Sequence, residues 1–318
     1  MFAEKPRNRL PLALTIVILF ALACSVVGAP AYDPTKVALE LQATQMSIEL
    51  TRSALNIPQE QPTLAPPPTL PAAQEPPTAS PPTAIPPTAT PDLMTRMKSA
   101  KILVYENTDE RNIGLWIKDA LDNLGLTYTH TGSYSGRFME YLNSGTVYDL
   151  IIVGAEDKDK ISGEFWDVIN NRLNRDNAAL IAEIWYLDRE ANGPISKIMG
   201  KCGIRYQKDY DLAESIYWWV PTHPIFNEPN TVLPLVHYSR FWANQTGDRI
   251  RLGGSGDAVL LAGLQTQSSS EGGVLAVCME GRVIFQTFSD HDYHEEDVVP
   301  LWENYIYNAL KARFAAMP

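Results

Sequence analysis

The densest group of side chains able to bind a metal or transfer a proton is Asp-His-Asp-Tyr-His-Glu at residues 290–295. Imidazole and carboxylate groups this close together can ligate zinc or a harder divalent ion, so His291 and His294 are candidate metal ligands. His291 is also a candidate catalytic residue. The alternative is a helix start, because Asp292 and Glu295 have the capping-box spacing and acidic groups stabilise a helix N-terminus. We favour the helix start and predict no cofactor, with a divalent metal as the alternative.

Other polar and aromatic side chains follow apolar runs that are typical of strands. In an open α/β sheet, ligands bind beyond the carboxyl ends of the strands. Glu183 is the second candidate catalytic residue for this reason. The candidate ligand-binding residues are Glu106, Glu156, Trp185, His223, Asp290 and Asp292. For His223, which precedes Pro224, a hydrogen bond within a loop is the alternative role. The aromatic groups at 217–219 and 241–242 suit either carbohydrate stacking or the core.

The first half of residues 92–318 alternates strand and helix patterns. Short apolar runs predict strands at 102–105, 126–130, 148–153 and 178–186. Apolar stripes at helical spacing predict helices at 111–124, 137–142 and 165–173. Strands and helices that alternate in this way predict a doubly wound, mostly parallel sheet with right-handed crossovers, of the flavodoxin or amidotransferase kind.

The second half changes character. Apolar runs at 259–264, 274–279 and 283–288 have short connections between them, and Glu280-Gly281 forms a tight turn between the last two. Short connections favour antiparallel pairing, so we predict an antiparallel or mixed C-terminal extension of the sheet. An apolar stripe then predicts a closing helix over 295–314.

The order of motifs over about 101–312 resembles the class I glutamine amidotransferase-like superfamily, particularly its ThuA-like branch. The motifs are Tyr-Asp-Leu-Ile-Ile-Val at 148–153, Thr-His-Pro-Ile at 222–225, Gly-Arg-Val-Ile-Phe at 281–285 and Ser-Asp-His-Asp at 289–292. Glutamine amidotransferases place a nucleophilic cysteine on a glycine-flanked turn after the strand matching 178–186. Here residues 182–187 read Ala-Glu-Ile-Trp-Tyr-Leu, without cysteine or glycine. The resemblance therefore implies the fold, while the missing thiol argues against glutamine hydrolysis.

The N-terminus predicts export. Basic residues precede an uncharged apolar run at 10–23, as in a signal peptide. Ala-Leu-Ala before Cys24 resembles the lipobox of bacterial lipoproteins, which implies a lipid on Cys24. An uncleaved anchor is the alternative, because residues 10–29 carry no charge and about 20 apolar residues span a bilayer. Either way we expect a protein of the cell membrane that faces the extracytoplasmic side.

Four parts are predicted from composition. Residues 1–23 form the signal peptide and 24–57 a lipid-anchored helical spacer. Residues 58–91 hold more than half of the 24 prolines and predict an extended, disordered Pro/Thr-rich linker. Residues 92–318 are long enough for one α/β domain. Cys202 and Cys278 within it form either a disulfide or two buried thiols.

These observations favour a membrane-anchored extracytoplasmic binding or scaffold module with a degenerate amidotransferase-like domain. A formal net charge of -11 argues against nucleic acid as a partner. The expected partners are the membrane, through the anchor, and a cell-envelope glycan or protein. The alternative is a carbohydrate-active or metal-dependent enzyme of the cell envelope.

Overall fold

The computed structural model describes residues 92–108, 113–156, 163–212, 214–238, 241–242 and 246–317. The predicted signal peptide, Cys24, the helical spacer and the Pro/Thr-rich linker all lie outside these residues. Across the described part of the chain, we find no helix with the length and apolar character that crossing a bilayer requires.

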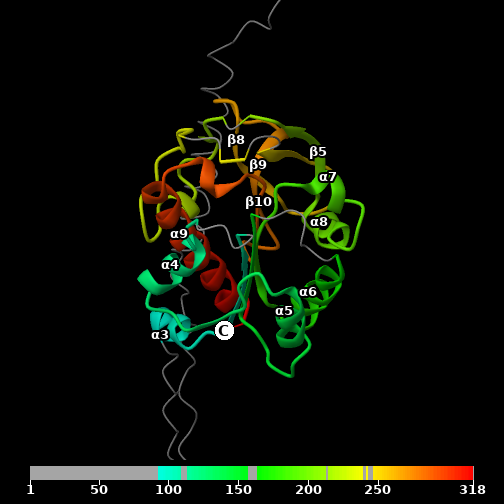
Figure 1. The fold of residues 1–318 in the computed structure, drawn as a ribbon, viewed down its shortest axis with the longest axis vertical. Helices are drawn as coiled ribbons and strands as arrows, with labels where there is room; N and C mark the ends of the chain where they lie inside the picture. The colour runs from blue at the N-terminus through cyan, green and yellow to red at the C-terminus, as the bar shows by residue number, and fades with distance from the viewer. Residues whose placement is uncertain are drawn as a thin grey trace, which may run out of the picture. The chain divides into compact units, whose positions relative to one another are not determined.

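The described residues contain a ten-stranded mixed sheet (Figure 1). Its main path has the strand order β2-β1-β3-β4-β10-β9-β7-β5, and β8 joins β9 and β6 beside this path. The strands are β1 (Ile102–Asn107), β2 (Tyr128–His130), β3 (Leu150–Ala155), β4 (Ala179–Glu183), β5 (Ile204–Tyr210), β6 (Tyr217–Trp218), β7 (Gly247–Leu252), β8 (Val259–Gly263), β9 (Glu271–Cys278) and β10 (Val283–Gln286).

The sheet changes from parallel to antiparallel after β10. Strands β1 to β4 are mutually parallel, and β10 adds to β4 in the same direction. Strand β9 then pairs antiparallel with β10, and the remaining pairs are antiparallel as well. This arrangement confirms the predicted fold class, an α/β domain with a mostly parallel sheet and an antiparallel extension.

Helices cover both faces of the parallel part (Figure 1). One hydrophobic cluster joins the sheet to α3 (Leu93–Lys98), α4 (Trp116–Asn123) and α9 (Glu295–Ala315). The other joins it to α5 (Ser135–Leu142), α6 (Glu164–Arg175) and α8 (Ser196–Cys202). Successive side chains of a strand point to opposite faces, which is why β1 and β3 need apolar residues at almost every position.

Several elements differ from the sequence predictions. The strand expected over 178–186 ends at Glu183, and the short helix α7 (Leu187–Glu190) follows. The elements α3, α7, α8, β5, β6 and β7 were not predicted. Strand β5 reads Ile-Arg-Tyr-Gln-Lys-Asp-Tyr and is mostly solvent-accessible, so it carries no apolar run. An antiparallel strand at the edge of a sheet can be this polar, because only part of it is covered.

The capping box predicted for the last helix is wrong. The residue that precedes α9 is His294, and it makes no side-chain cap. The Asp292 carboxylate instead accepts a 2.8 Å hydrogen bond from the backbone N–H of Phe241. The acidic first turn is confirmed, since Glu295, Glu296 and Asp297 all lie in it.

Cys202 and Cys278 form a disulfide that joins the end of α8 to the end of β9. Their Cα atoms are 5.2 Å apart, although 76 positions separate them in the chain. Both residues are buried. Of the two alternatives, the disulfide is therefore the one that the structure contains.

Replacing both cysteines with alanine should lower the free energy of unfolding by about 4 kcal/mol, because the crosslink no longer restricts the unfolded chain. Urea denaturation of the full chain measures this. Dithiothreitol added to the folded protein should have no effect, since neither sulfur is accessible. An unfolding free energy that is the same for the variant and the native chain would contradict a stabilising crosslink.

Candidate functional site

Three adjacent parallel strands, β3, β4 and β10, end at one edge of the sheet. Their register places Gly154 beside Glu183 and Glu183 beside Gln286. Residues at or just after these strand ends are therefore brought together, although the last strand lies about a hundred positions beyond the others in the sequence. This edge is where open α/β sheets bind ligands.

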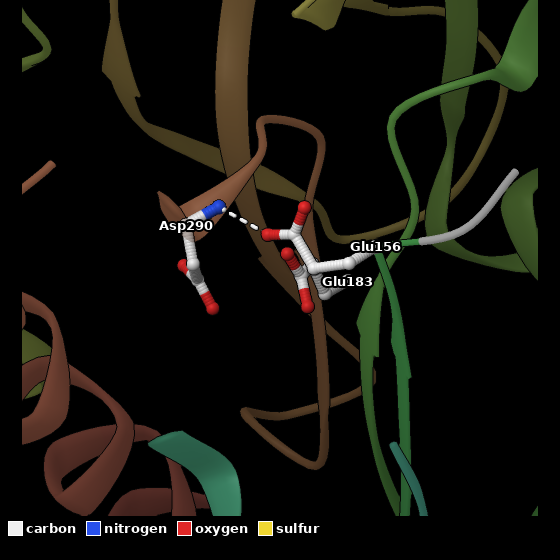
Figure 2. A group of neighbouring side chains, drawn as sticks. All are labelled: Glu156, Glu183 and Asp290. Atoms are coloured by element: carbon white, nitrogen blue, oxygen red, sulfur yellow. Dashed lines mark hydrogen bonds between the residues drawn. The ribbon is translucent and has the colours of Figure 1, made fainter. Parts of the chain in front are cut away.

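The carboxyl groups of Glu156, Glu183 and Asp290 meet at this edge (Figure 2). Oxygen atoms from the three side chains lie within 4.8 Å of one another. The three residues are only 3%, 1% and 2% exposed, respectively. Ionising all three buried and neighbouring carboxyl groups would cost much free energy. Their hydrogen bonds and nearby charges therefore determine which of them is ionised.

Glu156 receives most of the hydrogen bonds. Its Oε1 accepts from the backbone N–H of Asp290 at 2.7 Å (Figure 2), and its Oε2 accepts from the Ser289 hydroxyl at 2.8 Å. The indole N–H of Trp242 also donates to Oε2 at 2.8 Å. Burial alone would raise the pKa of Glu156, but the neighbouring His291 charge and the side-chain hydrogen bonds with His291, Glu183 and Ser289 lower the pKa to about 2. Glu156 is therefore the ionised member.

Asp290 is held by two side-chain donors. Gln286 donates to its Oδ1 at 2.5 Å, and the indole N–H of Trp302 on α9 donates to its Oδ2 at 2.6 Å. Burial, followed by the charge on Glu156, raises the pKa of Asp290 to about 7. A carboxyl group with this pKa exchanges its proton near neutral pH.

The surroundings of Glu183 favour its protonated form. Burial, the nearby Asp290 and Glu156 charges and a hydrogen bond to Glu156 raise its pKa well above the usual 4.5. Its Oε1 is buried and has no hydrogen-bond donor among the described residues. The three acids thus divide into one carboxylate, one neutral carboxyl group and one group poised between the two states.

The positive charge that balances Glu156 comes from His291. Its Nδ1 lies 3.0 Å from Glu156 Oε1, its Nε2 lies 3.2 Å from the Gly114 carbonyl oxygen, and its ring stacks on Trp116 at 4.1 Å. Burial lowers the pKa of His291, but the Glu156 charge and hydrogen bond outweigh this and raise the pKa to about 9. His291 is thus an imidazolium in a mostly buried ion pair.

Glu106 and Trp185 lie beside this group rather than within it. Glu106 Oε1 accepts from the Ile117 N–H at 3.0 Å, and its Oε2 lies 2.9 Å from His130 Nε2. Its carboxylate therefore stabilises the first turn of α4. Trp185 is buried with its ring 5.2 Å from that of Trp242, the residue that donates to Glu156.

His223, Asp292 and His294 have other partners. The Nδ1 of His223 accepts from the Ile225 N–H at 3.2 Å, which is the loop hydrogen bond expected as its alternative role. Asp292 binds the Phe241 N–H. The His294 ring lies 3.9 Å from that of Tyr238. Neither His291 nor His294 belongs to a cluster of three or more potential metal ligands among the described residues.

Sequence reasoning missed the donors that complete the site. Ser289 appeared only within the motif at 289–292, Gln286 carried no signal of its own, and Trp302 belonged to the apolar stripe of the last helix. A buried tryptophan usually finds an acceptor for its N–H, which is the one general clue that was present. Which acceptor it finds depends on how α9 packs against the sheet.

The buried carboxyl groups of Glu156, Glu183 and Asp290 can bind protons and exchange them with one another. A metal would meet an all-oxygen donor set from Glu156, Glu183 and Asp290, which suits a hard divalent cation. Two of the three carboxyl groups already have internal donors, so such an ion would compete with the hydrogen bonds from Trp242, Ser289, Gln286 and Trp302 for the carboxylate lone pairs.

No family model and no curated protein matches the sequence. Among solved structures, the chain is similar to a Thermoplasma acidophilum protein assigned as a GMP synthase component, with 12% sequence identity and a TM-score of 0.42. The similarity covers 69% of this chain and 98% of that one.

Glu156→Gln should destabilise the fold by about 3–5 kcal/mol, because it leaves the buried His291 imidazolium without its counter-charge. The matched control is Glu140→Gln on the exposed surface of α5, which should change stability by less than about 0.5 kcal/mol. Urea denaturation of both variants tests this. Equal effects for the two substitutions would show that the buried pair contributes nothing particular.

Stability should also fall as the pH rises from about 6.5 to 9. His291 holds its proton more tightly in the folded protein than its usual pKa of 6.5 allows, so its stabilisation is complete below pH 6.5 and is lost through pH 9. His291→Gln should flatten the dependence of unfolding free energy on pH in this window. Identical slopes in the native protein and the variant would refute this assignment.

Proposed function

We propose that the chain is a membrane-tethered extracytoplasmic binding or scaffold module, in which an amidotransferase-like α/β domain has no thiol chemistry. The carrying observation is the Cys202–Cys278 disulfide, which occupies both cysteines of residues 92–318. The third cysteine, Cys24, is the proposed lipidation site. The residues after β4 at the sheet edge are Ile184, Trp185 and Tyr186, so the place of the amidotransferase nucleophile holds no thiol.

The disulfide also supports export. Disulfides persist in oxidising compartments and are rare where glutathione and thioredoxin keep thiols reduced. This agrees with the basic and apolar N-terminal residues, which have the pattern of a secretory signal. The two observations are independent, because one concerns the folded domain and the other concerns residues 1–23.

Burial of the acidic group supports binding or scaffolding rather than turnover. A general acid or base must come within hydrogen-bond reach of its substrate. Glu156, Glu183 and Asp290 are instead almost fully buried, and Glu156 and Asp290 are engaged by internal donors. The group is best explained as a polar network that fixes β3, β4, β10 and α9 relative to one another.

An exposed aromatic and apolar surface is the proposed contact face. Ile216 pairs antiparallel with Leu235, so the segments that contain Tyr217 and Val236 lie side by side. Tyr217, Leu233, Val236 and Tyr238 are 37%, 71%, 64% and 62% exposed, and we call them the Tyr217–Tyr238 surface. Tyrosine joins an apolar ring to a polar hydroxyl, which suits contact with the faces of a cell-envelope glycan.

The second candidate function is a metal-dependent or carbohydrate-active enzyme of the cell envelope. It rests on the proximity of Glu156, Glu183 and Asp290 and on the unpartnered Glu183 Oε1. An enzyme of this kind would show divalent-metal-dependent hydrolysis of an envelope glycan that Glu183→Gln abolishes.

The full chain should release no ammonia from glutamine above a protein-free blank, because residues 92–318 hold no free thiol to attack the amide. A coupled glutamate dehydrogenase assay measures this, with an authentic glutaminase as positive control. Ammonia release that persists through repurification and is lost in a Glu183→Gln variant would overturn the proposal.

The full chain in detergent should co-sediment with purified peptidoglycan. Replacing both Tyr217 and Tyr238 with alanine should lower the affinity about tenfold, as loss of aromatic contacts does at other interfaces. Tyr134→Ala is the matched control, since Tyr134 is 65% exposed and lies beside α5. Equal losses in the two variants would rule out the Tyr217–Tyr238 surface, and no sedimentation would rule out this glycan as the ligand.

A further inference from the structure

A second acidic group, separate from Glu156, Glu183 and Asp290, lies on elements that the sequence analysis did not predict. Asp188 belongs to α7, Asp209 to β5 and Asp248 to β7. One carboxylate oxygen from each lies within 4.8 Å of the other two. Nothing in the network of Glu156, Glu183 and Asp290 involves these residues.

Two of these acids lie directly opposite each other on neighbouring strands. Strands β5 and β7 are antiparallel, and their register pairs Asp209 with Asp248. Residues opposite each other in this way project from the same face, and two like charges there destabilise the pair. No ion pair from Asp209 or Asp248 to a basic side chain occurs among the described residues.

The Asp248 carboxyl group has a buried oxygen that receives no donated hydrogen bond. Asp248 is 0% exposed. Its Oδ2 accepts a short hydrogen bond from the backbone N–H of Leu187, whereas its Oδ1 is buried and receives no hydrogen bond from an N–H or hydroxyl donor in the described structure. The Asp248 side chain also hydrogen-bonds to the Asp209 carboxyl group, which requires a proton on one of the two acids. Burial raises the pKa of Asp248 to about 8, which reflects the cost of ionising it without a cation. A buried acceptor that receives no donated hydrogen bond is rare in native proteins.

The side chains range from the surface to the interior. Asp188 is exposed, Asp209 is half-buried and Asp248 is fully buried. Tyr206, on the same strand as Asp209, donates from its hydroxyl to Asp209 Oδ1 at 2.5 Å, which fixes that carboxylate. An ion could therefore bind from solvent against the exposed acid and rest against the buried one.

We propose that Asp188, Asp209 and Asp248 form a binding site for a calcium ion. Calcium takes about six to eight oxygen ligands in flexible geometry, so three carboxylates and water can satisfy it. Magnesium demands a stricter octahedron and gives up its water reluctantly, and zinc prefers nitrogen or sulfur ligands. Extracytoplasmic modules bind calcium with Kd values of about 10⁻⁴–10⁻³ M, and we expect that range here.

The proposed calcium site has fewer hydrogen-bond donors and counter-charges than the group of Glu156, Glu183 and Asp290. There, indole, amide and hydroxyl donors and an imidazolium engage Glu156 and Asp290. At Asp248 the Leu187 N–H is the donor, and the facing acid Asp209 is its side-chain hydrogen-bond partner. No basic side chain forms an ion pair with Asp209 or Asp248 within the described residues. The proposal is independent of the proposed function, apart from the affinity range, which assumes an extracytoplasmic location.

The test is calcium titration of the full chain, previously treated with a chelator. Isothermal titration calorimetry should give one site per chain, and calcium at ten times Kd should raise Tm by about 3 °C. Terbium, which occupies calcium sites, should show luminescence sensitised by the nearby Tyr206. Mg²⁺ at the same concentration should cause less than half of the Tm rise.

The Asp248→Asn substitution should stabilise the chain without calcium but remove its stabilisation by calcium. Asp248→Asn should raise Tm without calcium, because it removes a buried acid while its amide oxygen can still accept from Leu187, and it should abolish the calcium response. Asp209→Asn should weaken calcium binding at least tenfold. Asp211→Asn, an exposed aspartate two positions further along, is the matched control and should behave like the native chain.

Several results would overturn the proposal. One is a native chain without calcium-dependent change in Tm or heat up to 10 mM, about ten times the weakest expected Kd. Another is a calcium response that Asp248→Asn retains. A response that Glu183→Gln abolishes while Asp248→Asn leaves it intact would assign the ion to the other acidic group.

Discussion

The parallel pairing of β10 with β4 is the constraint on which the candidate site depends. Strand β10 follows an antiparallel partner, β9, and enters the sheet beside a strand that lies about a hundred positions earlier in the chain. Because it runs parallel to β4, its carboxyl end delivers Ser289, Asp290 and His291 to the edge where β3 and β4 already end. An antiparallel β10 would carry these residues to the opposite edge, and Glu156 would lose its donors and its counter-charge.

The cost of burying several acids determines how this edge is built. One carboxylate is ionised and balanced by His291, a second carboxyl stays protonated, and the third is held by an amide and an indole N–H. Each arrangement lowers the free energy needed to remove a carboxyl group from water. Since the donors come from β10, α9 and the residue pair 241–242, the same bonds also fix these elements in relation to each other.

The disulfide fixes elements of the antiparallel half, as the hydrogen bonds of the acidic group fix those of the parallel half. It ties α8 to β9 and so holds β5, β7 and β9 to the layer of helices beside them. It also leaves residues 92–318 without a free thiol, because both of their cysteines are in this bond.

Local sequence patterns were sufficient to identify most elements of the parallel half. Apolar runs and helical stripes identified β1, β2, β3, β4, β8, β9, β10, α4, α5, α6 and α9, and they placed Glu156, Glu183 and Asp290 at strand ends. Local periodicity suffices there, because both faces of these strands are buried. The direction of β10, the disulfide and the pairing of His291 with Glu156 became known from the folded chain. The same holds for the alignment of Asp209 with Asp248, since β5 is too polar to be recognised. Each of these depends on contacts between residues distant in the chain, and no local pattern encodes which distant partner a side chain will meet.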